Sequence, residues 1–369
     1  MITAVTMPKW GLTMTEGKVV QWLKSPGASF APGEELLEIE TSKITNVMEA
    51  DAAGTLTRIV APEGSTLPIG ALLAVIAPPD TPPAEVDAFV AQFVVAEPQA
   101  VAADDAAPLV PREVQAADLT LRCLEMGSGD AVPVLLLHGF GADLNSWMFN
   151  QPALCEGRRT LALELPGHGL SSKDVGAGDV AGFTDAIEAA LAALAVDRLH
   201  VVGHSMGGAL AISLAARRPD AVATLSLLAP AGLGPEINGT FIDAFVRASR
   251  RKEAADALQS LVHDPSLISR AMVEELLRYK RLDGVAQALQ TVARAWFPQG
   301  RQTVDLVAAL RAVAVPVQVI WGRDDRIIPV AHADIVADSE QVHVLDDVGH
   351  LPHMEKAGEV NRLIRAFIS

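Results

Sequence analysis

The amino-acid sequence predicts a multidomain chain in which a small all-β sandwich precedes a large α/β domain. Two observations predict this architecture. Residues 1–78 contain two similar halves with matching glycines, and from residue 119 to residue 369 short apolar runs alternate with helical stretches. A Pro- and Ala-rich segment, residues 79–118, lies between them. A length of 369 residues agrees with two or three domains of ordinary size.

The composition excludes several classes of function. The net charge is −16, so the chain lacks the basic character that phosphate backbones require, and no nucleic-acid partner is expected. The two cysteines, Cys123 and Cys155, have no paired spacing, which argues against a disulfide framework and against a cysteine metal site. The N-terminal residues lack a basic start followed by an apolar run, and no apolar run reaches about 18 residues, so neither a signal peptide nor a membrane-spanning segment is expected. A cytoplasmic protein with no metal and no membrane partner is therefore expected.

An internal repeat defines residues 1–78. Gly27 and Gly33 in the first half match Gly64 and Gly70 in the second half at one constant offset. In each half an apolar run is followed by a glycine turn and a second short apolar run. This is the pattern of two strands joined where glycine supplies backbone angles that other residues resist. The two halves are expected to pack against each other as a small β-sandwich.

Lys43 falls between the two halves, in the segment Glu40-Thr41-Ser42-Lys43-Ile44-Thr45. A strand on each side predicts that this lysine lies at the tip of a tight hairpin. The arrangement resembles the lipoyl domain of 2-oxo acid dehydrogenase complexes over nearly its whole length, which implies lipoate covalently attached to Lys43. Biotinyl domains share the architecture but flank their lysine with methionines, whereas Ser42 and Ile44 stand here. An ordinary solvent-exposed hairpin lysine is the alternative.

The segment 79–118 has the composition of a tether. It begins with a proline-rich, extended stretch and later becomes rich in Ala, Pro and Asp. Between these parts, residues 85–95 predict a short amphipathic helix that carries Phe89 and Phe93. This helix either packs on its own chain or docks a partner, and packing on its own chain is favoured. A tether would let a carrier domain visit more than one active site.

Short apolar runs mark the strands of the large domain, residues 119–369. The runs are Val134–Leu137, Thr160–Leu165, Leu199–Val202, Val317–Trp321 and Gln341–Leu345. The third run leads into Gly203-His204-Ser205-Met206-Gly207, a G-x-S-x-G pattern with a strand before it and a helical stretch after it. In that setting the pattern predicts a nucleophile elbow, a strained turn that presents the Ser205 hydroxyl above the sheet.

A serine nucleophile needs a basic histidine and an acid that orients the histidine. The fourth apolar run is followed by Asp324 and Asp325, and the fifth by His350 and, three residues later, His353. The chain order of serine, acid and histidine, together with the strand–turn–helix context of Ser205, resembles the α/β-hydrolase family. That resemblance implies Asp325 as the acid, with Asp324 as the alternative, and His350 as the base in preference to His353.

The same resemblance implies an oxyanion hole made by two backbone N–H groups. They belong to Met206, directly after the nucleophile, and to Phe140, in the turn after the first apolar run. Residues 232–302 interrupt the strand pattern with helical sequence, which in this family forms a cap over the active site. Trp296 and Phe297 either line an acyl pocket or belong to the core of the cap.

A lipoyl domain fused to an α/β-hydrolase resembles the dihydrolipoamide acetyltransferase (E2) component of bacterial acetoin dehydrogenase complexes. The resemblance implies transfer of an acetyl group from a lipoyl arm to coenzyme A. It also implies a thiamine diphosphate-dependent E1 partner and a dihydrolipoamide dehydrogenase (E3) partner, and it is compatible with a homo-oligomer.

One feature of the usual E2 catalytic domain is missing from the sequence, a histidine motif that ends in Asp-Gly. The one Asp-Gly pair, Asp283-Gly284, has no histidine four residues upstream. The transfer is therefore assigned to Ser205, acylated by a lipoyl thioester and deacylated by coenzyme A with His350 as the base. Two alternatives are a serine hydrolase, in which water accepts the acyl group, and a non-catalytic scaffold. The complete set of serine, acid and histidine argues against the scaffold.

Overall fold

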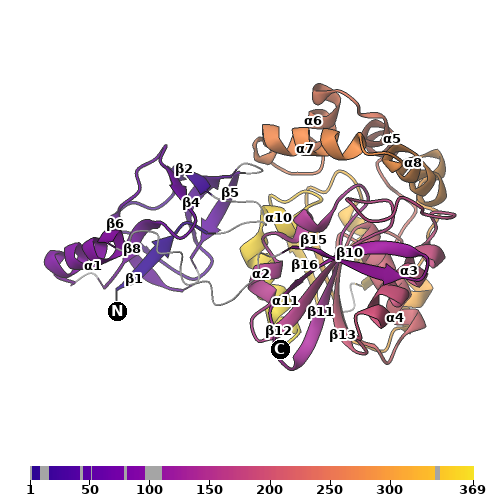
Figure 1. Ribbon diagram of the computed structural model, residues 1–369, viewed down its shortest axis with the longest axis horizontal. Helices are drawn as coiled ribbons and strands as arrows, with labels where there is room; N and C mark the ends of the chain where they lie inside the picture. The colour runs from indigo at the N-terminus through magenta and orange to yellow at the C-terminus, as the bar shows by residue number, and fades with distance from the viewer. Residues whose placement is uncertain are drawn as a thin grey trace. The chain divides into compact units, whose positions relative to one another are not determined.

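The computed structural model describes residues 2–8, 16–41, 45–50, 52–78, 81–95, 110–336 and 341–369. The chain forms two compact units, Met1–Pro108 and Leu109–Ser369 (Figure 1). The first is built mostly of β-strands, and the second alternates strands with helices. No helix among the described residues is long and apolar enough to span a membrane.

Two four-stranded antiparallel sheets make up the first unit. Their strands are β1 (Thr3–Thr6), β2 (Glu16–Trp22), β3 (Ser29–Phe30), β4 (Glu35–Glu40), β5 (Thr45–Glu49), β6 (Gly54–Ile59), β7 (Thr66–Pro68) and β8 (Leu72–Ile76). One sheet has the order β1-β8-β6-β3 and the other the order β5-β4-β2-β7. Strands β2, β3 and β4 of the first half thus hold the same places as β6, β7 and β8 of the second. The repeat in the sequence is a repeat of structure, and the predicted all-β sandwich is confirmed.

The four glycines of the repeat support this arrangement through their backbone angles. Gly27 and Gly64 have φ of +90° and +85°, and Gly33 and Gly70 have φ of +81° and +80°. A Cβ atom on Gly27, Gly64 or Gly70 would meet no other atom within 4 Å. Glycine is therefore required here by the left-handed backbone conformation and not by a lack of space. The N–H groups of Gly27 and Gly64 each donate to a carbonyl of the opposite half at 2.7 Å, which ties the halves together.

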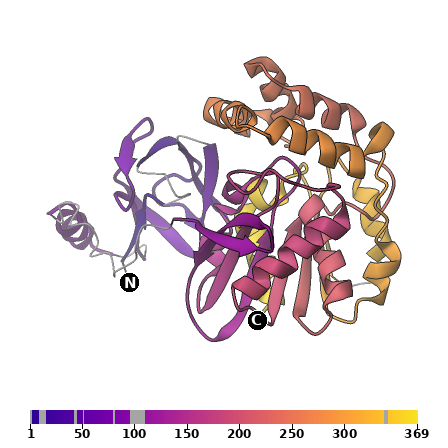
Figure 2. The ribbon, with the colours of Figure 1, turned by 45° about the vertical axis from the view of Figure 1, so that its right-hand side comes forward.

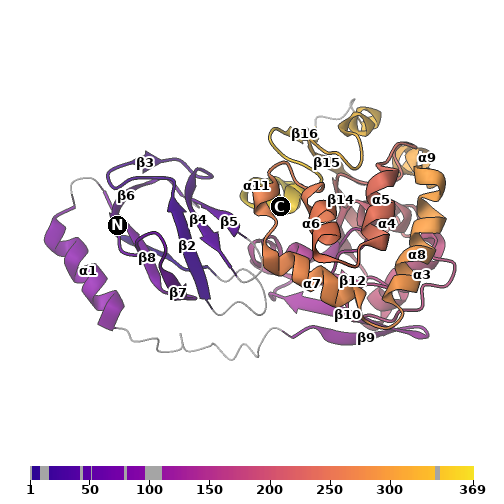
Figure 3. The ribbon, with the colours of Figure 1, turned by 90° about the horizontal axis from the view of Figure 1, so that it is seen from above.

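A helix packs against strand β8 of this unit. Helix α1 (Pro83–Val95) lies within the segment predicted as a tether and contacts β8 (Figure 3). Val86 is buried against Leu72 and Val75, and Phe89 and Phe93 pack beside it. The apolar side of the helix thus covers its own unit, in agreement with the favoured interpretation of residues 85–95.

An eight-stranded sheet forms the centre of the second unit. Its strands are β9 (Arg112–Ala116), β10 (Leu119–Met126), β11 (Ala131–Leu137), β12 (Arg158–Glu164), β13 (Leu199–His204), β14 (Val222–Leu228), β15 (Val317–Gly322) and β16 (Val342–Leu345). The strand order is β16-β15-β14-β13-β11-β12-β10-β9. The strands from β11 to β16 are parallel, β10 pairs antiparallel with β12, and β9 pairs antiparallel with β10 at the edge of the sheet. This is the predicted α/β-hydrolase sheet.

The sheet begins earlier in the chain than the sequence predicts. Strand β9 starts at Arg112, inside the segment assigned as a linker, and pairs with β10. Only Val114 and Ala116 of β9 are buried, while the other three residues of the strand are exposed. The two buried residues alternate with polar or charged ones and form no apolar run. The sequence therefore gives little indication of this edge strand.

Two groups of helices flank the sheet on opposite faces (Figures 1 and 3). One group contains α3 (Val180–Ala193), α4 (Met206–Arg217) and α9 (Val307–Ala312), and the other α2 (Gln151–Leu154), α10 (Pro352–Glu355) and α11 (Ala357–Phe367). Short 3₁₀ turns connect some elements, namely η1 (Leu144–Trp147), η2 (Pro265–Leu267), η3 (Pro298–Gly300) and η4 (Val330–Val336).

Four further helices lie between β14 and β15 and gather at one end of the sheet (Figure 2). They are α5 (Gly239–Arg247), α6 (Arg251–Gln259), α7 (Arg270–Lys280) and α8 (Val285–Trp296), and we call them the cap. They fall within residues 232–302, the segment predicted as a cap. Side chains join the cap to the sheet loops: the Tyr279 hydroxyl donates to Gly167 O at 3.0 Å, and the indole N–H of Trp296 donates to Gly178 O at 2.8 Å. Trp296 is fully buried and belongs to the cap core.

Candidate active site

The residues predicted to carry the chemistry all follow parallel strands of the large sheet. Phe140 follows β11, Ser205 follows β13, Asp325 follows β15 and His350 follows β16. The carboxyl ends of parallel strands lie at one edge of a sheet, so these loops converge there. In the sheet, β11 lies between β12 and β13. The chain adds β12 on one side of β11 and then β13 on its other side, so the direction of winding changes between β11 and β13. Ligands of α/β sheets bind at such a switch point.

Ser205 stands in a strained turn between β13 and α4. Its φ is +52° and its ψ −116°, angles that cost free energy for a residue with a side chain. The glycines beside it leave no room for a Cβ atom. At Gly203 that atom would lie 2.4 Å from the Gly207 oxygen, and at Gly207 it would lie 2.1 Å from the Leu137 oxygen. The chain here has the shape that the G-x-S-x-G pattern predicts.

A buried carboxylate holds the imidazole of His350. Asp325 Oδ2 lies 2.7 Å from His350 Nδ1, and the two side chains are 0% and 4% exposed. The Asp325 carboxylate also accepts the backbone N–H groups of Ile327 (2.8 Å) and Ile328 (3.0 Å) and the indole N–H of Trp321 (3.0 Å). These donors stabilise the ionised carboxylate and fix its orientation. With Nδ1 donating to Asp325, Nε2 of His350 is the nitrogen left to accept a proton.

Asp324, the alternative acid, has a different partner. Its carboxylate lies 3.0 Å from Nδ1 of His263, in the cap, and its side chain is 40% exposed. The structure therefore brings Asp325, and not Asp324, to His350.

The backbone of His350 is bonded to the residue that precedes the nucleophile. Nε2 of His204 lies 2.8 Å from the His350 carbonyl oxygen, and the two rings are 4.9 Å apart. His353 lies next to them, with its ring 4.5 Å from that of His204. It is fully buried, its ring nitrogens have no hydrogen-bond partner among the residues that the structure describes, and burial lowers its pKa to about 3. His353 is thus a neutral neighbour without a carboxylate, whereas His350 has one.

The turn after β11 lies directly against Ser205. A Cβ atom on Gly139 would be 3.2 Å from Ser205 Cβ and 2.9 Å from His204 Nδ1. The N–H groups of Phe140 and Met206 have no hydrogen-bond partner within the described part of the chain. Two unengaged N–H groups at the base of Ser205 suit a developing oxyanion.

The Phe140 side chain connects this turn to the cap. Its ring centroid is 5.8 Å from that of Phe245 in α5 and 5.9 Å from that of Phe297 after α8. The glycine at position 141 makes room for this packing, because a Cβ atom there would come within 2.2 Å of the Phe245 ring. Of the two residues predicted for an acyl pocket or a cap core, Phe297 therefore lies beside the oxyanion turn, whereas Trp296 lies in the cap core.

Other buried ionisable groups near this edge brace loops. Glu164 accepts the backbone N–H groups of Leu170 (2.7 Å) and Ser171 (3.1 Å), and burial raises its pKa to about 7. Burial lowers the pKa of His138 to about 4 and that of His168 to about 3. Both histidines are fully buried and stay neutral at physiological pH.

Two places in the second unit offer groups that bind ions. His263, Asp324 and Asp347 form a partly exposed cluster that is already joined by the His263–Asp324 hydrogen bond. A groove of about 410 Å³ between α5 and α8 has Arg247 and Arg294 among its lining residues. Guanidinium groups suit phosphates, which coenzyme A carries.

Lys43, the predicted site of lipoate, lies outside the described residues. The strands on each side of it are described: β4 and β5 pair in antiparallel register up to Glu40 and Thr45. Four residues, including Lys43, join those paired ends. The register therefore agrees with the tight hairpin that the sequence predicts.

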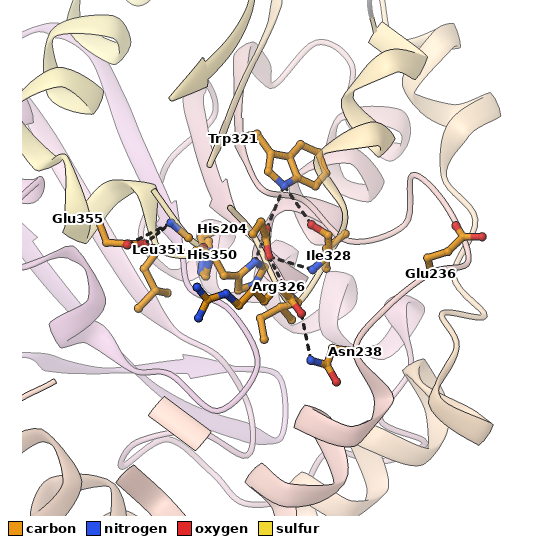
Figure 4. A network of polar contacts seen from close by, with 12 residues as sticks. His204, Glu236, Asn238, Trp321, Arg326, Ile328, His350, Leu351 and Glu355 are labelled. Atoms are coloured by element: carbon orange, nitrogen blue, oxygen red, sulfur yellow. Dashed lines mark hydrogen bonds and ion pairs between the residues drawn. The ribbon is translucent and has the colours of Figure 1, made fainter. Parts of the chain in front are cut away.

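Three residues of the site were not singled out from the sequence: Trp321, His204 as a partner of the His350 backbone, and Glu355, which accepts N–H groups on both sides of His350 (Figure 4). Trp321 is the last side chain of a predicted apolar run, and burial alone explains its type. The role of Glu355 depends on which backbone groups the fold brings to it, which no local pattern reveals.

Comparisons with known proteins agree with the folds of both units. The family model described as alpha/beta hydrolase fold matches residues 132–357, and the biotin/lipoyl model, described as biotin-requiring enzyme, matches residues 3–76. Among solved structures, a meta-cleavage product hydrolase superposes with a TM-score of 0.64 at 22% identity, over 70% of this chain and 97% of its own. That likeness shows the fold of the second unit.

Two relatives match the whole chain. The dihydrolipoyllysine-residue acetyltransferase component of the acetoin cleaving system from Pseudomonas putida is 42% identical, over 100% of this chain and 98% of its own length. The protein with the same description from Cupriavidus necator is 39% identical, over 99% and 96%. The chain therefore belongs to the family of dihydrolipoyllysine-residue acetyltransferase components of acetoin cleaving systems.

Proposed function

We propose that the chain transfers an acetyl group from a dihydrolipoyl thioester to coenzyme A, with Ser205 as a covalent nucleophile, His350 as its base and Asp325 as the acid that orients His350. As a member of its family the chain is an acetyltransferase that carries lipoate and uses coenzyme A. The observation that supports the serine mechanism best is the buried Asp325–His350 hydrogen bond of 2.7 Å, at the sheet edge where the strained turn presents Ser205.

Acylation would begin at the Ser205 hydroxyl. Its oxygen attacks the thioester carbonyl while Nε2 of His350 takes the proton. The N–H groups of Phe140 and Met206 stabilise the oxyanion of the tetrahedral intermediate. His350 would return this proton to the departing thiolate, so that the acetyl group remains on Ser205 as an ester.

Deacylation would follow the same path in reverse with a new thiol. His350 accepts the proton of the coenzyme A thiol, and the sulfur attacks the acetyl-serine carbonyl. Collapse of the second oxyanion returns the proton to Ser205 and releases acetyl-coenzyme A. Water would compete at this step, so the site must exclude it. The aromatic contacts of Phe140 with Phe245 and Phe297, between the oxyanion turn and the cap, support such exclusion.

Lys43, at the β4–β5 hairpin, is the residue that would hold the prosthetic group. Lipoate bound there supplies the dithiol on which acetyl groups are carried as thioesters. The relatives are components of an acetoin cleaving system, and this chain is likewise part of a multienzyme system. We propose a thiamine diphosphate-dependent E1 as the source of the acetyl group and a dihydrolipoamide dehydrogenase (E3) as the enzyme that reoxidises the dithiol. A homo-oligomer and a cytoplasmic location fit this proposal.

A direct test follows acetyl-coenzyme A and free acetate separately. The lipoylated protein receives S-acetyl-dihydrolipoamide with or without coenzyme A, and Ser205→Ala runs beside it. Formation of acetyl-coenzyme A that depends on Ser205 is the expected result. Acetate formed at one rate with or without coenzyme A would overturn the transferase and leave a serine hydrolase. Several relatives of the second unit are named as hydrolases, such as a 2-hydroxymuconate semialdehyde hydrolase with 28% identity.

A further inference from the structure

Glu355, at the C-terminal end of α10, accepts hydrogen bonds from two separate parts of the second unit. Its carboxylate accepts the backbone N–H of Gly349 (3.0 and 3.1 Å) and that of Leu351 (3.1 Å), the residues on either side of His350 (Figure 4). It also accepts the backbone N–H of His263 at 2.6 Å. His263 lies between α6 and η2, in the cap. One carboxylate thus binds the loop of the predicted base and a segment of the cap.

The two segments are also in direct backbone contact. The N–H of His350 donates to Leu261 O, in the cap, at 2.7 Å. Gly349 permits this approach, since a Cβ atom there would lie 2.7 Å from the Leu261 oxygen and 2.8 Å from the His263 nitrogen. We call residues 261–263 the cap strap.

The N–H groups of residues 349, 350 and 351 and the carbonyl of His350 therefore each have a partner. The N–H groups at 349 and 351 bind Glu355, the N–H of His350 binds the cap strap, and its carbonyl binds His204. Asp325 fixes the ring itself. Of these partners, Glu355 alone is bonded both to the His350 loop and to the cap strap.

We propose that Glu355 is a positioning residue that couples the seating of the cap to the alignment of His350 with Ser205. This inference rests on the proposed role of His350 as the base. A carboxylate suits the task because it has two oxygens and no proton to donate, so it accepts several N–H groups at once. Without it, the N–H groups on both sides of His350 would lose their partners, and the loop would be free to shift relative to Ser205.

The chemistry predicts a loss in kcat with little change in KM. A misplacement of about 1 Å costs on the order of 100-fold in rate when a base must meet a proton in line. Glu355→Gln keeps the shape and one acceptor oxygen but turns an amide NH₂ toward an N–H donor. We expect its kcat for acetyl transfer to fall about 10- to 100-fold and that of Glu355→Ala to fall further, with KM for coenzyme A within about threefold of wild type.

Glu359→Gln is the matched control, because it changes a carboxylate on the adjacent helix α11 that bonds neither to the cap strap nor to the His350 loop. Its kcat should equal that of wild type. A spectroscopic readout separates positioning from stability: the His350 Nδ1 proton, hydrogen-bonded to Asp325, should give a far-downfield NMR signal. Glu355→Gln should shift or broaden this signal at temperatures well below unfolding, whereas Glu359→Gln should not.

A separate experiment tests the coupling between the cap and the His350 loop. Gly349→Ala pushes the cap strap away without touching the Glu355 side chain, so it should lower kcat on its own. Combined with Glu355→Gln it should lower kcat by less than the product of the two single effects, because both break one linkage. Fully multiplicative effects would overturn the coupling.

The outcomes also separate this proposal from the proposed function. If Glu355→Gln lowers only the melting temperature and leaves kcat and the NMR signal unchanged, Glu355 has a purely structural role and the inference is wrong. If wild type releases acetate regardless of coenzyme A, yet Glu355→Gln slows that hydrolysis and moves the NMR signal, the positioning role stands and the transferase assignment fails.

Discussion

The two units of this chain place their predicted reactive residues in opposite ways. In the first, Lys43 joins the ends of two paired strands, and a repeated glycine frame sets their positions. In the second, the site combines residues that are far apart in sequence: the bond between the His204 side chain and the His350 backbone spans 146 positions. A carrier group needs only to be presented, and a hairpin does this locally. Acyl transfer needs aligned atoms, which requires the whole fold.

The largest expected effect comes from exchanging one reactive residue of each unit. Lys43→Arg should abolish turnover of the assembled complex with acetoin, because arginine offers no amine for lipoate, yet leave transfer from free S-acetyl-dihydrolipoamide unchanged. Ser205→Ala should lower both activities by about 10⁴- to 10⁶-fold, since it removes the nucleophile. Rates of acetyl-coenzyme A formation in the two assays measure this.

The same pair of variants can refute the division of roles between the two units. If Lys43→Arg also slows the reaction of the free thioester by more than about twofold, the first unit contributes to the chemistry of the second. If Ser205→Ala keeps a tenth of the wild-type rate in the free assay, the transfer does not pass through this serine.

The next effect concerns the acid. Asp325→Asn should lower kcat on the order of 10⁴-fold, because an amide NH₂ in place of Oδ2 would face the donors of Trp321 and His350 and would favour the wrong imidazole tautomer. Asp324→Asn is its matched control. That carboxylate is partly exposed, and the amide oxygen of Asn can still accept the hydrogen bond of His263, so the substitution should change the rate by about twofold or less. Equal losses for both variants would refute the assignment of the acid to Asp325.

The sequence predicts well the parts of the site that rest on local patterns. The glycine repeat and the G-x-S-x-G turn are each contained in a few residues whose types the backbone requires, whereas the role of Lys43 stays a prediction. Chain order after the strands favours Asp325 over Asp324, and the structure gives the geometric reason: the first is buried against His350, while the second faces the cap.

Residues whose partners come from distant segments escape sequence reasoning. Glu355 is the fifth residue after His350, but its third donor is His263, which is 92 positions away. Trp321 reads as an ordinary core residue until its indole N–H is seen at the Asp325 carboxylate. Strand β9 escapes for a different reason, because its two buried positions alternate with exposed polar ones at the edge of the sheet.

Acid should destabilise the second unit before the first. All nine histidines of the chain follow residue 137, so the first unit has none. Four lie fully buried and neutral at the active-site edge, with burial as the main cause: the pKa falls to about 4 for His138, to about 3 for His168 and His353, and well below 6.5 for His204. Below pH 6.5 the unfolded chain gains protons that the folded unit cannot bind. The free energy of unfolding should therefore fall, by up to about 1.4 kcal/mol per pH unit for each histidine.

Glu164 opposes this trend. Burial raises its pKa to about 7, above the unfolded value of 4.5, so it contributes stability that is full below pH 4.5 and lost as the pH rises through 7. Burial raises the pKa of Glu355 as well, but two carboxyls against four histidines leave the net effect with the histidines. Scanning calorimetry of the full chain at pH 7.5, 6.5 and 5.5 should move the transition of the second unit to lower temperature and leave that of the first nearly constant. Parallel shifts of both transitions would contradict this.

The smallest expected effect is on stability, and it distinguishes the unfolding transition of the first unit from that of the second. Gly64 and Gly157 have φ of +85° and +71°, and a Cβ atom on either would meet nothing within 4 Å, so alanine at each adds only backbone strain. That strain costs about 1–2 kcal/mol. In the small first unit, Gly64→Ala should lower the melting temperature by about 4–8 °C per kcal/mol, and in the larger second unit Gly157→Ala should lower it by about 2–4 °C per kcal/mol. Each variant should move one transition only, and neither should change the rate with free S-acetyl-dihydrolipoamide. If Gly64→Ala moved both transitions together, the units would unfold as one body. The independence on which the comparison of carrier and enzyme depends would then be lost.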